Sequence, residues 1–251
     1  MSDAKFFHTP YFVSSVVAHA IYELGIEDKV EVVTMGFQDM KGEFHLKKHP
    51  QGKIPFYTEG DFTLIESSAI LLYILEKYDT EKKLTNFVDI HQRGKFYQFL
   101  LNCPTQIYPN FVQLYAHRVL FPAGHPARSE GTITSSVETW HLEIAPFVVA
   151  QLGSQQYILG EEFTAADCLV GYNVLMGELL GEISEYPTLV AYLERLRARP
   201  AFAKCFTEEN KQYLPTLERY ADSLQRKGVH MAELRAARAE RLEAAKQTTH
   251  A

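Results

Sequence analysis

The spacing of apolar residues predicts a mixed strand and helix pattern at the start of the chain. Residues 4–8 form a short apolar run typical of a buried strand. From Val13 to Leu24, apolar side chains recur every three or four positions, which is the spacing of one helix face, and Gly25 is placed to end that helix. Residues 29–35 alternate between polar and apolar side chains like a strand. The chain is therefore predicted to begin strand, helix, strand.

Two further strands and a helix are predicted after a polar stretch that ends at His49. The runs "IPFYT" (54–58) and "FTLI" (62–65) flank a glycine turn, as the strands of a hairpin do. The apolar residues of 67–78 then continue as a helix. The order β-α-β-(α)-β-β-α describes a small α/β domain of about 80 residues, with one additional short helix allowed in the polar stretch.

Beyond a polar linker only helical patterns occur. Thr164 precedes Asp167 by three residues, which is the spacing of a capping box at a helix start. The last residues are rich in Ala, Glu and Arg with a thin apolar stripe, so we expect an exposed or loosely docked helix there. We expect an α/β domain over 1–80, an all-helical domain over 86–222 and a charged tail over 223–251. Within the second domain the predicted helices are 86–120, 132–152, 164–180, 187–198 and 200–222.

Composition restricts the classes of function. The chain has 251 residues, 46% of them hydrophobic, and a net charge of −6, which argues against nucleic acid as the main partner. Its three cysteines lie far apart, as expected in a reducing compartment. We see no secretory signal and no apolar run of about 18 residues, so we expect a cytoplasmic protein without a membrane span. His117, His125 and His141 lack metal-ligand spacing, so no metal is assigned.

The segment 54–67 combines features that suit a small zwitterionic peptide. The residue before a proline is extended and Pro55 cannot donate to a ladder, so the backbone of Ile54 can stay free at the sheet edge to pair with a ligand. Glu66 and Ser67 stand where a strand ends and a helix begins. The helix amino end favours a carboxylate near Ser67, and the Glu66 carboxylate can accept from an ammonium group.

The same residues have a purely structural interpretation. Serine and glutamate are common capping residues in a first helical turn, and prolines are common at strand starts. The residues alone leave both interpretations open.

The stretch "HPQGKIPFYTEGDFTLIESSAILLYILEKY" resembles the glutathione-binding half of cytosolic glutathione transferases. Their pattern is Asn-Pro-x-Gly-x-Ile/Val-Pro, a hairpin, and then Glu-Ser-x-Ala-Ile, with His49 replacing the asparagine in this chain. The segment "FTAADC" is similar to the capping box that starts a buried helix of the family's second domain. The resemblance covers about 1–222 and implies an α/β thioredoxin-like N-terminal domain followed by an all-α C-terminal helical domain.

The resemblance implies a transferase that uses glutathione as co-substrate, with no other cofactor, and directs its thiolate at a small apolar electrophile. Ile54 would pair with the cysteinyl backbone beside a cis Pro55, and Glu66 and Ser67 would hold the γ-glutamyl group. Lys53 would face the glycyl carboxylate, although a solvated turn lysine is an equal alternative. The family also implies a cytoplasmic homodimer that acts in detoxification.

The thiolate needs a stabilising group, because a free thiol has a pKa of about 8.5. In the family, a hydroxyl or thiol beside the start of the first helix provides it. Counting back from Gly25 places that position at Tyr11, whereas the strand tyrosine of other classes falls near Phe7, which has no hydroxyl. We therefore predict a hydroxyl-type rather than a cysteine-type relative, with Tyr11 as the first candidate and Ser14 as the second. The alternatives are a cap of the first helix by Ser14 or Ser15, favoured for Ser15, and Tyr11 as a packing aromatic.

The electrophile is expected between the domains, against the first helices of the second domain. That region is strongly aromatic, and Tyr108 and Phe111 are the favoured contacts, although such a stripe more often forms core. A different class of function remains open, namely a binding or scaffold protein that keeps the fold with little activity. The absence of a clean hydroxyl motif and the charged tail both favour it.

Overall fold

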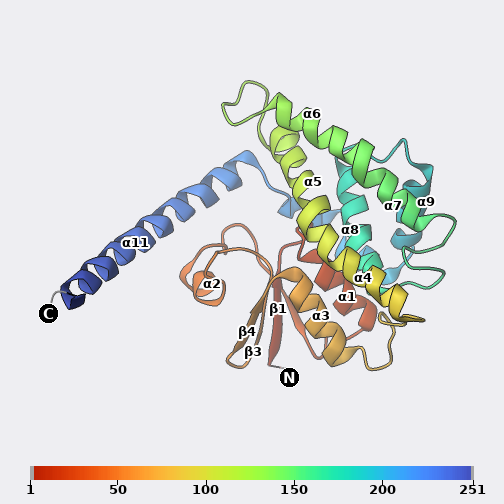
Figure 1. Ribbon diagram of the computed structural model, residues 1–251, viewed down its shortest axis with the longest axis horizontal. Helices are drawn as coiled ribbons and strands as arrows, with labels where there is room; N and C mark the ends of the chain where they lie inside the picture. The colour runs from red at the N-terminus through yellow and green to blue at the C-terminus, as the bar shows by residue number, and fades with distance from the viewer. Residues whose placement is uncertain (1–2, 250–251) are drawn as a thin grey trace.

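The computed structural model describes the backbone of residues 3–249, and their side chains apart from those of 223, 224, 227, 230 and 241–249. A small sheet with its helices occupies the lower part of Figure 1, and the helices α4 to α9 lie to its right and above it. The last helix, α11, projects away from both parts. The predicted fold class, thioredoxin-like followed by all-helical, is confirmed.

The first part has the predicted order of elements. The strands and helices are β1 (Ala4–His8), α1 (Ser15–Leu24), β2 (Glu31–Thr34), α2 (Glu43–Lys48), β3 (Phe56–Glu59), β4 (Phe62–Ile65) and α3 (Ser67–Tyr78). The strands lie side by side in the order β2-β1-β3-β4. β1 runs parallel to β2, and β3 is antiparallel to both of its neighbours.

Alternation along the strands gives the sheet two buried faces. Phe6 and Tyr57 belong to the large apolar cluster that also contains residues of α1 and α3. Phe7 and Phe56 point to the opposite face, where their rings stack 4.3 Å apart and pack with Met35. The continuous apolar runs of the sequence are thus explained by burial on both sides.

Helix α1 ends as predicted but begins differently. Gly25 adopts the left-handed conformation at φ 67° and its N–H bonds to the Ile21 carbonyl, as a helix C-cap does. At the other end, Ser14 has helical dihedral angles and makes no side-chain capping bond. Its hydroxyl instead accepts from the Thr9 N–H at 3.1 Å and donates to the Thr9 carbonyl at 3.0 Å. The interpretation of Ser14 as a helix cap is therefore wrong.

The second part is built from helices joined in places without a break. They are α4 (Ile90–Asn102), α5 (Tyr108–Tyr115), α6 (Glu130–Thr139), α7 (Ala145–Leu152), α8 (Ala165–Leu179), α9 (Pro187–Arg197) and α10 (Pro200–Cys205). The π-turns η1 (Cys103–Ile107), η2 (Ala116–Leu120) and η3 (Trp140–Ile144) extend or connect α4 to α7. Pro104 lies inside η1, and a wide turn accommodates a residue that lacks an N–H.

Helix α8 is the buried centre of this part. The Thr164 hydroxyl caps its amino end and the Asp167 carboxylate bonds back to the Thr164 N–H, so the predicted capping box is confirmed. Asp167 also accepts from the Ile158 N–H and the Tyr192 hydroxyl, both at 2.9 Å. The carboxylate thereby fixes the start of α8 to the preceding loop and to α9.

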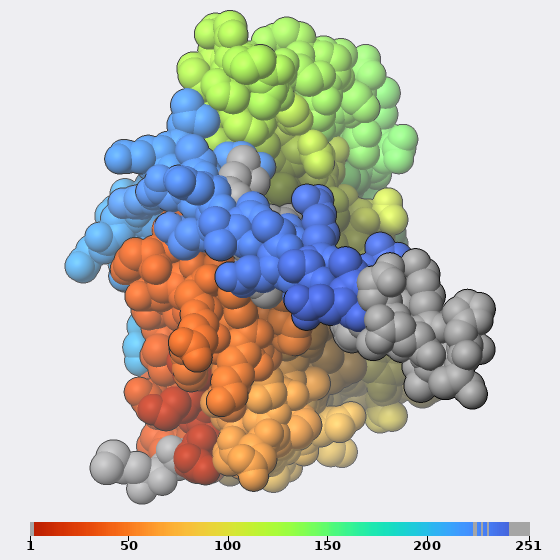
Figure 2. Space-filling view, turned by 90° about the vertical axis from the view of Figure 1, so that its left-hand side faces the viewer, coloured from red at the N-terminus to blue at the C-terminus, as the bar shows by residue number. Residues whose placement is uncertain are grey.

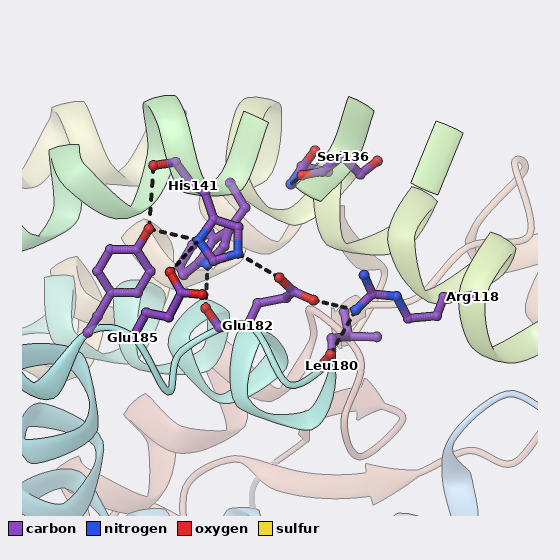
Figure 3. A network of polar contacts seen from close by, with 9 residues as sticks. Arg118, Ser136, His141, Leu180, Glu182 and Glu185 are labelled. Atoms are coloured by element: carbon purple, nitrogen blue, oxygen red, sulfur yellow. Dashed lines mark hydrogen bonds and ion pairs between the residues drawn. The ribbon is translucent and has the colours of Figure 1, made fainter. Parts of the chain in front are cut away.

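A polar network ties the turn after α8 to η2 and η3 (Figure 3). Nε2 of His141 lies 2.8 Å from a Glu182 oxygen, and its Nδ1 lies 2.8 Å from the Tyr186 hydroxyl. Arg118 bonds to the other Glu182 oxygen and to the Leu180 carbonyl. Both ring nitrogens of His141 thus have protein partners, and the network acts as a structural link.

The predicted continuous helix over 200–222 is wrong, because residues 206–216 interrupt it. α10 ends at Cys205, a short 3-10 turn, η4, covers Glu209–Tyr213, and α11 spans Leu217–Thr249. Leu214 is extended because Pro215 follows it, which separates the two helices.

Helix α11 is exposed along the part whose side chains are described. Val229 is 60% exposed and Leu234 44%, which fits the expectation of an exposed tail helix. Figure 2 shows α11 crossing the molecule next to the segment drawn in orange. An Arg226 nitrogen donates to the Phe37 carbonyl at 2.8 Å and fastens the helix there. Within residues 3–249 no helix combines the length and apolar character that a membrane span needs.

A buried ion pair joins the two parts where α1 packs against α10. Two nitrogens of Arg199 bond to the two oxygens of Glu23, both at 2.7 Å, and His19 adds a contact at 3.3 Å. Burial opposes the charge on Glu23, but the hydrogen bonds from Arg199 and His19 outweigh it and lower the pKa of Glu23 to about 2. The pair therefore persists as ions at neutral pH.

We expect Glu23→Gln to lower the free energy of unfolding at pH 7 by about 1.5–3 kcal/mol, because a bidentate bond to a charged group is lost. The folded-state pKa lies below the ordinary value of 4.5, so the stabilisation is complete above that pH and disappears as the pH falls toward 2. Denaturant unfolding of both proteins between pH 7 and pH 2 measures this. Glu27→Gln, which breaks an exposed pair with Lys204, is the control with an expected loss under about 1 kcal/mol. A stability difference that stays constant over this pH range would contradict the assignment.

Candidate active site

The strand register brings the three candidate segments to one end of the sheet. Phe56 is paired with Phe7 on one side and with Ile65 on the other. Continuing the second register by one residue sets Pro55 opposite Glu66. The start of β3, the end of β4 and the turn between β1 and α1 therefore lie together, and two helices begin there.

Ile54 offers an unpaired backbone at this end. The Ile54–Pro55 peptide bond is cis, as predicted. Ile54 is partly buried, and neither its N–H nor its carbonyl bonds to any other described residue. An extended peptide could add here as a short strand.

The segment before Ile54 is held by a histidine that the sequence analysis missed. His45 is fully buried, its Nε2 lies 2.8 Å from the Lys53 carbonyl, and its Nδ1 accepts from the Lys41 N–H at 2.9 Å. Because Nδ1 accepts, Nε2 carries the hydrogen and donates. Burial lowers the pKa of His45, which favours this neutral form. The Lys53 side chain itself is exposed.

Glu66 and Ser67 form the start of α3. Glu66 has φ 74° and ψ 117°, a backbone conformation that costs a non-glycine residue about 1–3 kcal/mol. Its carboxylate is exposed and makes no capping bond, so the capping interpretation of Glu66 is wrong. Ser67 is the first residue of the helix and is 8% exposed. Among the described residues the Glu66 carboxylate has no hydrogen-bond or ion-pair partner, and the strained turn presents it beside the first N–H groups of α3.

The two predicted hydroxyls at the start of α1 are directed at backbone carbonyls. Tyr11 has φ 63°, is 4% exposed, and donates its hydrogen to the Thr207 carbonyl at 3.2 Å. Burial raises the pKa of Tyr11 to about 12, so the phenol stays protonated. The hydrogen of Ser14 is directed at the Thr9 carbonyl, as described above. In this arrangement neither hydrogen points to a free space for a sulfur atom.

The two aromatic candidates of α5 differ in position. Tyr108 is the first residue of α5 and is partly exposed, with its ring centre 6.0 Å from that of Tyr172. Phe111 is 0% exposed and packs against Trp140 with ring centres 4.8 Å apart. The Phe111 ring thus has no surface to offer an electrophile, and Tyr108 has some.

A cavity of about 700 Å³ lies between the α2 region and α11. Lys41, Lys47 and Arg226 give it basic groups, and Glu43 and Glu233 give it acidic ones. Lys41 is the residue whose N–H bonds to His45, so the cavity adjoins the support of Lys53.

The thiols of the chain lie outside this site. Cys103, Cys168 and Cys205 are buried and unpaired, and burial raises the pKa of each well above that of a free thiol. Over the described residues, no three His, Cys, Asp or Glu side chains are grouped as metal ligands.

Two family models match the chain in the order of its two parts. Residues 6–82 match the glutathione S-transferase N-terminal domain, and residues 111–200 match the C-terminal domain. Glutathione S-transferase F10 of Arabidopsis thaliana is 33% identical over 165 residues, which cover 64% of this chain and 74% of the relative. The chain belongs to the glutathione S-transferase family.

More distant relatives extend the match over the length of the transferase fold. Glutathione S-transferase 1 of Schizosaccharomyces pombe is 25% identical over 218 residues, covering 78% of this chain and 91% of that protein. The crystal structure of a Phanerochaete chrysosporium glutathione transferase in complex with oxidized glutathione covers 85% of this chain and 98% of that one, with a TM-score of 0.70 at 22% identity. The resemblance deduced from residues 49–78, and with it the prediction of a glutathione transferase, is confirmed.

In a glutathione transferase, the contact of His45 with the Lys53 carbonyl would position the Lys53–Ile54 segment for glutathione. We expect His45→Ala to raise KM for glutathione about tenfold and to leave kcat nearly unchanged, because the Lys53–Ile54 segment loses a hydrogen bond worth about 1 kcal/mol and a packed ring. His45→Gln, which can still donate to the Lys53 carbonyl, should recover part of the loss. Steady-state kinetics with varied glutathione measures this. Equal loss in both variants, or a loss in kcat alone, would contradict the role.

Proposed function

We propose that this transferase binds glutathione where α1 and α3 begin and directs the glutathione thiolate onto a small apolar electrophile. The observation that carries the proposal is the Ile54 backbone beside the Glu66 carboxylate, neither of which has a hydrogen-bond partner among the described residues. A tripeptide with an ammonium group and two carboxylates complements this arrangement in shape and charge.

The proposal gives each residue one part of glutathione. The cysteinyl backbone pairs with Ile54 as an added strand. The γ-glutamyl ammonium group bonds to Glu66, and its carboxylate meets the Ser67 hydroxyl and the N–H groups of α3. Lys53 supplies a positive charge for the glycyl carboxylate, at the side where the basic groups of the α2 cavity lie.

The chemistry is the ionisation and aiming of one thiol. The thiol proton leaves to water, and the amino end of α1 stabilises the sulfur anion through its dipole. The thiolate then forms a bond to an electrophilic carbon and the leaving group departs with the electron pair. Holding both substrates in one site makes the attack effectively unimolecular.

The electrophile lies, in this proposal, at the junction of the two parts on the Tyr108 side. A junction of domains is a common position for apolar pockets. We further propose a cytoplasmic homodimer with a role in detoxification, which the family membership supports.

A scaffold protein with little activity is the second candidate. The orientation of the Tyr11 and Ser14 hydroxyls toward carbonyls favours it, as does helix α11, which is exposed over most of the part whose side chains are described. Retention on immobilised glutathione combined with no turnover of an aromatic halide, a peroxide or an isothiocyanate would select the scaffold function. Turnover of any of these would select the enzyme.

We expect Glu66→Gln to weaken glutathione binding about 5- to 12-fold, because a charge-assisted hydrogen bond of about 1.5–3 kcal/mol becomes a neutral one of about 0.5–1.5 kcal/mol. The glutamine keeps the size of the side chain at this strained position. Isothermal titration calorimetry measures the affinity, and Glu76→Gln on the exposed far end of α3 is the control. Unchanged affinity in Glu66→Gln would refute the proposed site.

A further inference from the structure

The C-terminal helix α11 is fastened to the stretch that carries α2, residues 36–53, which we call the α2 segment. Where the two cross (Figure 2), a guanidinium nitrogen of Arg226 donates to the Phe37 carbonyl at 2.8 Å. The Phe37 ring packs edge-on against Phe12 with ring centres 5.8 Å apart, so this carbonyl is a fixed anchoring point for the helix. A charged donor makes the bond stronger than one between neutral groups.

Beyond Arg226 the helix lies across a cavity rather than on a closely packed surface. The cavity of about 700 Å³ is lined on the α2 side by residues that include Lys41 and Leu46, and on the α11 side by residues that include Val229. Val229 remains 60% exposed beside it. Because the described side chains of α11 bury little apolar surface here, the Arg226 bond is a main contribution to the docking of the helix.

The α2 wall of this cavity packs against the residue that precedes Lys53. Gly52 has φ 61°, and a β-carbon at this position would lie 3.0 Å from Cγ of Lys41 and 3.2 Å from a methyl carbon of Leu46. The N–H of Lys41 also donates to His45, whose other ring nitrogen supports the Lys53 carbonyl. A displacement of the cavity wall therefore reaches the Lys53 backbone both by packing and by hydrogen bonds.

We propose that Arg226 is a positioning residue for glutathione binding: by fastening α11 to Phe37, it holds the α2 segment where the Lys53–Ile54 backbone can pair with the tripeptide. This inference rests on the proposed function. Arg226 itself neither touches glutathione nor takes part in the chemistry. It changes the fraction of molecules whose site is ready to bind, and the affinity falls in proportion to that fraction.

Steady-state kinetics with varied glutathione tests this role. We expect Arg226→Ala to raise KM for glutathione about fivefold, the lower end of the couplings commonly found between separate sites, and to leave kcat within about twofold of wild type. Arg226→Lys, which can still donate a hydrogen bond to the carbonyl, should recover part of the affinity. Arg235→Ala is the control, because Arg235 is exposed farther along the same helix. A calorimetric Kd gives the same comparison if turnover is slow.

A double-mutant cycle with His45 identifies the route. If Arg226 acts through the contacts of Lys41 and His45, Arg226→Ala should add little once His45→Ala is present. The double variant should then show the rise in KM of about tenfold that is expected for His45→Ala alone, whereas independent effects would multiply to about fiftyfold. A general loss of stability would not produce this non-additivity.

Linkage gives a second measurement that needs no variant. If the docking of α11 favours glutathione binding, saturating glutathione must favour the docking of α11 by the same factor. We therefore expect amide hydrogen exchange over residues 217–229 of the wild-type protein to slow about fivefold with glutathione bound. Exchange over α9, which lies in the helical part, should stay unchanged.

Three results would overturn the inference. They are a KM for glutathione that is the same in Arg226→Ala and wild type, a rise in KM that Arg235→Ala reproduces, and a KM of the double variant that shows independent effects. Exchange over α11 that ignores glutathione would count against it equally. A wild-type protein that binds no glutathione would instead refute the proposed function, which separates the two cases.

Discussion

The position of β3 between β1 and β4 is the constraint on which the candidate site depends. Its register with both neighbours sets the Ile54–Pro55 segment beside Glu66 and beside the turn that leads into α1. The stacked rings of Phe7 and Phe56 and the buried Tyr57 hold that register from both faces of the sheet. A slip of one residue would turn every side chain of β3 to the wrong face and separate the proposed glutathione contacts.

The junction with the helical part determines the direction of the hydroxyl groups near the start of α1. Tyr11 turns its hydroxyl away from the start of α1 because Thr207 and the ring of Phe206 receive it at the junction. Tyr172 donates to the Tyr11 carbonyl at 3.1 Å from the same side. The helical part thus supplies polar groups to a turn that the thioredoxin-like part builds, so the proposed chemistry needs both.

Features that depend on residues close together in the sequence could be predicted, and features that depend on residues far apart in the sequence could not. The capping box of Thr164 and Asp167 and the element order of the first part are local patterns, and they were predicted correctly. The orientation of Tyr11 depends on residues almost 200 positions away, and no local pattern carries it. His45 was missed because one histidine in a polar stretch gives no sign of the carbonyl that it will support. The interruption just before α11 had a signal in Pro215, which the periodicity of 200–222 masked.

A crystal structure of the protein with glutathione tests the central claim most directly. The account predicts a tripeptide extended along the start of β3, with its cysteinyl backbone paired to Ile54 and its ammonium group on Glu66. Glutathione bound elsewhere, or this end of the sheet empty at saturating glutathione, would contradict the account.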